Sequence, residues 1–83
     1  MQIYVLKKED NVVRFGLKDA NSTIIEPVIE ALNQDKDVVF ARYIVDHPDL
    51  DDPILEVKVS AGTPEEAVKR AAESVKKIFA DLQ

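Results

Sequence analysis

Residues 54–66, with the sequence ILEVKVSAGTPEE, change from a strand pattern to a helix start within a few positions. Apolar and polar residues alternate through 54–59, which predicts a strand with one buried face. The residues on that inward face are Leu55, Val57 and Val59. Thr63 is a good helix cap, and Pro64 after it suits the first helical position. We therefore predict a strand followed at once by a long helix that runs from Pro64 nearly to Leu82.

The rest of the chain contains four further elements. Residues 2–6 and 12–17 predict a β-hairpin, and 38–45 predict the longest strand because they are rich in β-branched and aromatic side chains. Thr23-Ile24-Ile25-Glu26 fits a capping box, so we expect an amphipathic helix from there to about Asn33. The order is ββαββα. It predicts an α+β two-layer sandwich, with a four-stranded, mainly antiparallel sheet and two helices on one face.

Length and composition limit the function classes. With 83 residues there is room for one domain, residues 1–83, and without cysteine there is neither a disulfide framework nor a thiolate zinc site. The apolar start of the chain is too short for a signal peptide or a membrane span, so we expect a cytoplasmic protein that does not contact a membrane. The net charge of −5 predicts no direct contact with nucleic acid.

The residues most able to carry chemistry lie at 46–53, where His47 stands among four aspartates. One interpretation is a divalent-cation loop and the other is an acidic turn shaped by Pro48 and Pro53. A calcium loop of the EF-hand type needs a central glycine and a glutamate at its twelfth position, and the segment has neither. No nucleophile can be assigned to His47 by spacing. We therefore expect no metal site, no catalytic residue and no cofactor.

Three segments, in this order along the chain, resemble the archaeal DNA-directed RNA polymerase subunit L family. Residues 40–50 are similar to the family's run between its third and fourth strands, in which Tyr43, His47 and Pro48 match the motif and Asp49 is an insertion. Residues 64–68 resemble the start of the family's C-terminal helix. Residues 21–25 occupy the place of the entry to its first helix.

Departures from the family pattern fall in the first helix. Ser22 stands where the family usually has histidine, Glu26 stands where asparagine is common, and Pro27 follows it. These positions belong to a dimerisation motif that the family shares with the N-terminal domain of the bacterial α subunit. The family is also related to the small α-like subunit of eukaryotic RNA polymerases.

The resemblance implies a non-catalytic assembly protein that pairs with the D subunit of RNA polymerase, the larger member of the pair. The two would form the platform for the large catalytic subunits in transcription, and the isolated chain would be weakly stable or would self-associate. Two apolar helix faces suit such a four-helix interface. The expected interface residues are Thr23, Ile24, Ile25, Val28, Ile29, Leu32, Val68, Ala72, Val75, Phe79 and Leu82. The sequence does not divide them between the sheet and the partner.

Two other classes of protein remain open from the residues. One is a regulatory α+β module that binds a small molecule between copies of a homo-oligomer, which would require a concave polar site. The other is a small hydrolase or dehydratase on a related sandwich. That class needs several convergent histidines, arginines or carboxylates, and His47 is the only histidine.

Overall fold

Six elements follow one another in the order ββαββα. The computed structural model describes residues 2–46 and 51–81, and of Ser22 and residues 78–81 it describes the backbone. The elements are β1 (Gln2–Glu9), β2 (Val12–Lys18), α1 (Ser22–Gln34), β3 (Val38–Ile44), β4 (Ile54–Val59) and α2 (Pro64–Asp81). The α+β class and both helix positions predicted from the sequence are confirmed.

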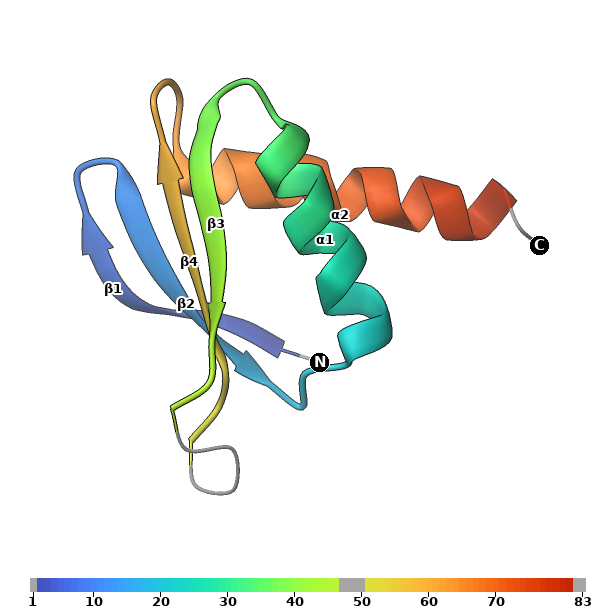
Figure 1. The fold of residues 1–83 in the computed structure, drawn as a ribbon, viewed down its shortest axis with the longest axis horizontal. Coiled ribbons are helices and arrows are strands. Elements are labelled where there is room, and N and C mark those ends of the chain that lie inside the picture. Colours follow the sequence, from blue (N-terminus) through green and yellow to red (C-terminus); the bar gives the residue numbers. More distant parts are fainter. Residues whose placement is uncertain (1, 47–50, 82–83) are drawn as a thin grey trace.

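The four strands form one sheet in the order β1-β2-β4-β3, and every neighbouring pair is antiparallel. β2 and β3 therefore run in the same direction, and α1 links them while β4 fills the place between them. Both helices lie on one face of this sheet (Figure 1). α1 packs against β3 and α2, and α2 also contacts β4 and β2. We call the side of the sheet beneath the helices the inner face.

The hairpin of β1 and β2 is longer than the sequence predicted. β1 continues to Glu9, so the turn consists of Asp10 and Asn11 alone. The pairing register shifts between Val5 and Lys7, which places a β-bulge in the strand. The bulge accommodates one extra residue in β1, so Lys7 and Lys8 still pair with residues of β2.

The core lies between the inner face and the two helices. The predicted inward residues of β2 and β4 are at most 4% exposed, which confirms the alternation. The sheet contributes Val13, Phe15, Leu17, Ala41, Leu55, Val57 and Val59, and the helices contribute Ile25, Val28, Leu32, Ala67, Val68, Ala71 and Val75.

The N-terminus of α1 differs from the predicted capping box. The N-cap is Asn21, whose backbone is extended and whose side-chain oxygen accepts a hydrogen bond from the backbone N–H of Thr23 at 3.0 Å. Thr23 is therefore already inside the helix and is not its cap. Asn and Thr both serve as caps, and Asn is the stronger of the two, so the helix begins at the earlier residue. Pro27 lies in the second turn, where it costs one hydrogen bond to an exposed carbonyl.

The C-terminal end of α1 is fastened to its neighbours by side chains. The Asn33 amide bonds both backbone groups of Ala41 in β3, accepting from its N–H at 3.0 Å and donating to its carbonyl at 3.4 Å. Asp35, the C-cap, accepts a hydrogen bond from Arg70 of α2 at 3.0 Å. The backbone N–H of Asp37, together with Arg70, keeps the pKa of the Asp35 carboxyl below its usual value.

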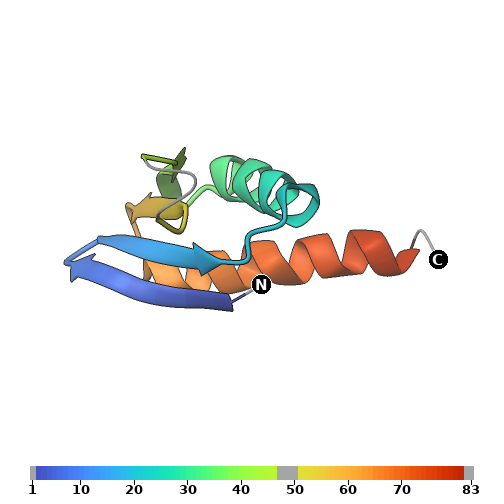
Figure 2. The same cartoon turned by 90° about the horizontal axis from the view of Figure 1, so that it is seen from below.

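α2 begins as predicted and then runs past the rest of the fold. The Thr63 hydroxyl accepts a hydrogen bond from the backbone N–H of Glu66 at 3.2 Å, and Gly62 takes the positive φ of 71° that the tight turn requires. Both views show the second half of α2 projecting beyond the sheet and beyond α1 (Figures 1 and 2).

Glu56 is the one strongly buried charge among the described residues. Its position in β4 is on the face opposite the helices, as predicted, yet the residue is only 6% exposed. Arg14 of β2 and Arg42 of β3 approach the carboxylate from either side, at 2.6 and 2.8 Å. The hydrogen bond and the charge of Arg14, and after them the charge of Arg42, hold the pKa of Glu56 below its usual value near 4.5 against the opposing effect of burial.

We expect the Arg14–Glu56–Arg42 cluster to make stability fall in acid. Because the pKa of Glu56 is lower in the folded chain, its contribution is present above pH 4.5 and is lost as the pH falls through the folded pKa. The free energy of unfolding of the wild type should therefore exceed that of Glu56→Gln at pH 7, and the difference should be smaller at pH 3. Urea denaturation at both pH values measures the difference, and a gap independent of pH would contradict it.

Candidate functional site

An apolar pocket of about 300 Å³ opens on the helix side of the molecule. It lies where the edge strand β1, the start of α1 and the middle of α2 come together. Its lining residues are Ile3, Ile24, Ile25, Val28, Leu55, Val68, Ala72, Val75 and Lys76. Lys76 carries the one charged side chain among them, so the described lining includes no carboxylate, hydroxyl or thiol.

The lining divides into a floor and a rim. The floor residues are at most 8% exposed and belong to the core: Ile25, Val28, Leu55, Val68 and Val75. The rim is open to solvent, with Ile3 45% exposed, Ile24 38% exposed and Ala72 also exposed. A pocket with an apolar floor and a rim that is apolar except for Lys76 is suited to receive an aliphatic side chain and gives a polar substrate few groups to bind.

The structure separates the predicted interface residues into three groups. Ile25, Val28, Leu32, Val68 and Val75 are buried and hold the monomer together. Thr23, Ile24 and Ala72 are exposed, and Ile29 is half-buried. The side chain of Phe79 and all of Leu82 lie outside the described residues.

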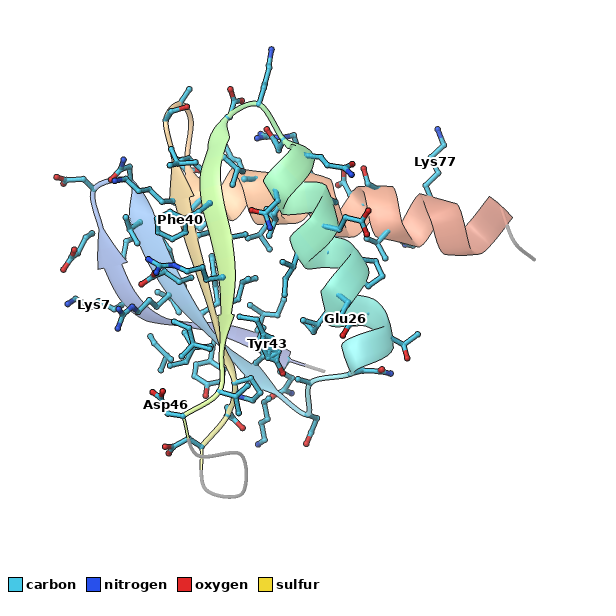
Figure 3. The ribbon with its side chains drawn as sticks, viewed as in Figure 1. Lys7, Glu26, Phe40, Tyr43, Asp46 and Lys77 are labelled. Carbon is cyan, nitrogen blue, oxygen red and sulfur yellow. The ribbon has the colours of Figure 1, made fainter. Side chains whose placement is uncertain are left out.

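Of the predicted motif residues, Tyr43 is described and does not line this pocket. Tyr43, near the end of β3, is 39% exposed and pairs with Leu55 of β4 in the sheet register. Figure 3 shows Tyr43 and Asp46 toward the end of the molecule where β3 leaves the sheet. His47 and Pro48 lie outside the described residues. In residues 2–46 and 51–81 no group of three or more His, Asp or Glu side chains could hold a metal ion.

One wall of the pocket was missed from the sequence. Ile3 and Val5 point to the helix side of β1, opposite Leu17 and Phe15 of β2, yet they are 45% and 53% exposed. The helices cover β2, β4 and β3 and leave this edge of the inner face open (Figure 2). Alternation in residues 2–6 indicated that Ile3 and Val5 share one face of the strand. It could not indicate that the helices stop short of these two residues.

The chain is similar throughout its length to subunits of archaeal RNA polymerases. Residues 12–83 match the family described as the RNA polymerase Rpb3/Rpb11 dimerisation domain. The DNA-directed RNA polymerase subunit Rpo11 of Thermoplasma acidophilum is 33% identical over 78 residues, covering 94% of this chain and 70% of the relative. Rpo11 of Pyrococcus furiosus is 37% identical over 82 residues, with 95% and 83% covered.

A solved structure shows the same fold. The crystal structure of DNA-directed RNA polymerase subunit L from Thermoplasma acidophilum superposes with a TM-score of 0.87 at 32% identity, covering 98% of this chain and 80% of that one. Fold and sequence therefore define an α+β dimerisation domain. The chain belongs to the RNA polymerase Rpb3/Rpb11 dimerisation domain family, and the resemblance to archaeal subunit L predicted from the sequence is confirmed.

No helix in the described part of the chain is long and apolar enough to cross a membrane.

Because the core residues are buried and the rim residues are exposed, truncating a core residue should lower the free energy of unfolding more than truncating a rim residue. Leu32→Ala removes a side chain that is fully buried between α1 and the sheet, so it should lower the free energy of unfolding by about 2–5 kcal/mol. Ile24→Ala truncates a rim residue and should cost about 1 kcal/mol or less. Urea denaturation of the isolated chain measures both. Equal costs would show that Ile24 belongs to the core and not to the rim.

Proposed function

We propose that the chain is a non-catalytic assembly subunit of a DNA-directed RNA polymerase in the cytoplasm. In this role it pairs with the D subunit of the polymerase through α1 and α2, and the pair serves as a platform on which the large catalytic subunits assemble. The observation that carries the proposal is the open apolar pocket between β1, α1 and α2 in a chain of a dimerisation-domain family. Because the relatives named above are subunits of DNA-directed RNA polymerases, we expect such a dimer to belong to a polymerase of this kind.

Physical chemistry favours burial of this surface by another protein. Ile3, Val5 and Ile24 keep between 38% and 53% of their surface in water. Covering them releases about 25 cal/mol for every Å² of apolar area. Interfaces of permanent complexes are apolar at their centre and polar at their rim, which matches a pocket bordered by Lys76. A chain of 83 residues also gains stability from a partner, because small domains bury a small share of their surface.

The C-terminal half of α2 extends the same surface. Figure 3 shows Lys77 projecting from the part of α2 that lies beyond α1, with no other helix or strand of the described residues beside it. A helix that continues without a neighbour makes few contacts of its own, so packing must come from outside the chain for it to be stable. Two helices from the D subunit would supply that packing and complete a four-helix arrangement.

Charges placed on the rim should prevent dimerisation and leave the fold intact. We expect Ile24→Asp and Ala72→Asp each to weaken the complex with the D subunit from the same source by at least about tenfold, because an unpaired carboxylate would be buried at the interface. Co-expression followed by size-exclusion chromatography should give a one-to-one complex for the wild type. It should give separate proteins for the variants.

Val39→Asp is the matched control, since Val39 is 55% exposed on β3 and away from the pocket. Circular dichroism of each purified variant checks that the fold persists. The proposal is wrong if the wild-type chain stays a stable monomer in the presence of the D subunit. A chain that forms only homodimers, stabilised against heat by a metabolite, would favour the regulatory small-molecule module instead.

A further inference from the structure

The face of the sheet opposite the helices is uncovered, and its side chains form three parallel rows across the strands. The strand register sets the rows. The first row is Glu9, Val12, Lys58 and Phe40, the second is Lys7, Arg14, Glu56 and Arg42, and the third is Tyr4, Gly16, Ile54 and Ile44. We call these residues the outer face. Figure 3 shows Lys7 pointing away from the side where the helices lie.

The second row holds two arginines in fixed positions. Arg14 gives its Nε–H group to the Glu56 carboxylate, and Arg42 gives one terminal nitrogen to the other oxygen of the same carboxylate. Arg42 also stacks on the Phe40 ring, 4.3 Å from the ring centre. Each guanidinium has five N–H donors, so both retain donors for another anion. Their side chains are 48% and 62% exposed, so these donors can be reached.

The third row is apolar and adjoins the arginines. Tyr4 lies over Gly16, where an added Cβ would collide with the ring, and its hydroxyl donates a hydrogen bond to Asp52 at 2.6 Å. Ile54 and Ile44 continue the row and are half-buried. Leu6, at the bulge, is 51% exposed and lines a hollow of about 210 Å³ together with Tyr4 and Ile54. Arginine and aromatic residues beside aliphatic ones are typical of the centres of protein interfaces.

The charge of the outer face is opposite to that of the chain. Its first two rows carry four cations, Lys7, Arg14, Arg42 and Lys58, against the carboxylates of Glu9 and Glu56. The chain as a whole has a formal charge of −5. An excess of positive charge on this face therefore selects an acidic partner by charge complementarity.

We propose that the outer face docks an acidic segment of a third subunit of the same polymerase, with its carboxylates on Arg14 and Arg42 and an apolar side chain on the third row. This proposal rests on the proposed function, since it concerns the face that remains free when α1 and α2 are occupied by the dimer partner. The two arginines are held in place before binding, so little side-chain entropy is lost when the segment docks.

A protein segment fits this face better than nucleic acid does. Asp46, Asp51 and Asp52 lie beyond the third row, around the hollow formed with Tyr4 and Leu6, and they would repel a polyanionic backbone that continued in that direction. The buried Glu56 also removes one positive charge from the centre of the patch. A segment that presents carboxylates at one end and an apolar side chain at the other avoids the repulsion from these aspartates, and it needs only the few donors that Arg14 and Arg42 keep free.

Neutralising the cluster as a unit tests the proposal. The variant Arg14→Gln/Arg42→Gln/Glu56→Gln removes all three charges, so no unpaired charge is left buried. We expect it to keep the complex with the D subunit and to bind the remaining polymerase subunits about tenfold more weakly than the wild type. Size-exclusion chromatography of the co-expressed dimer mixed with those subunits, at two salt concentrations, measures both steps. Leu6→Asp should weaken the second step alone, through the third row.

Lys69→Gln on the exposed side of α2 is the control, because it changes the net charge by the same amount away from the outer face. The proposal fails if the triple variant and Leu6→Asp assemble with the remaining subunits as well as Lys69→Gln does while the dimer with the D subunit is intact. It also fails if the triple variant assembles normally and loses binding to a labelled single-stranded DNA, which would identify a nucleic-acid surface. Absence of the dimer with the D subunit in the wild type would instead refute the proposed function, and this proposal with it.

Discussion

The packing of α1 against α2, with α1 on β3 and α2 on β4 and β2, is the contact on which the rest of the structure depends. It buries the two helices and the centre of the sheet in one core. α2 runs across the strands, and its 18 residues make it about 27 Å long (Figure 1). Its first half packs on β4 and β2, and its second half projects beyond the sheet and beyond α1. The apolar pocket lies where the start of α1 and the middle of α2 meet β1, the strand that the helices leave uncovered.

The two sides of the molecule present different chemistry as a result. The helix side offers aliphatic side chains around a pocket with a single lysine, which favours a partner with a similar apolar surface. The outer face offers fixed arginines beside an apolar row, which favours a partner of opposite charge. Because the sheet lies between these surfaces, occupation of one does not block the other. A subunit with this arrangement can connect two neighbours that do not contact each other.

Most of the fold could be predicted from the sequence, because its signals are local. The alternation in β4 and the Thr63-Pro64 helix start both concern residues within one turn or one strand. The cap of α1 was assigned to Thr23 in place of Asn21 because both are good caps and lie two residues apart. The exposure of Ile3 and the burial of Glu56 could not be predicted from their neighbours in the sequence. The first depends on where the helices end over the sheet, and the second depends on arginines from two other strands.

The hydrogen bonds from Asn33 to Ala41 have a consequence for the way this sheet could grow. β3 is an edge strand, and the amide occupies backbone groups that a further strand would need, next to a register shift between Val38 and Phe40. β1, the opposite edge, has no such cover in the described part of the chain, and every residue in it is exposed. A further strand can therefore pair with β1 but not with β3. Two copies of the chain could pair through their β1 strands. Both edges of the joined sheet would then be β3 strands, so a third copy could not add to it.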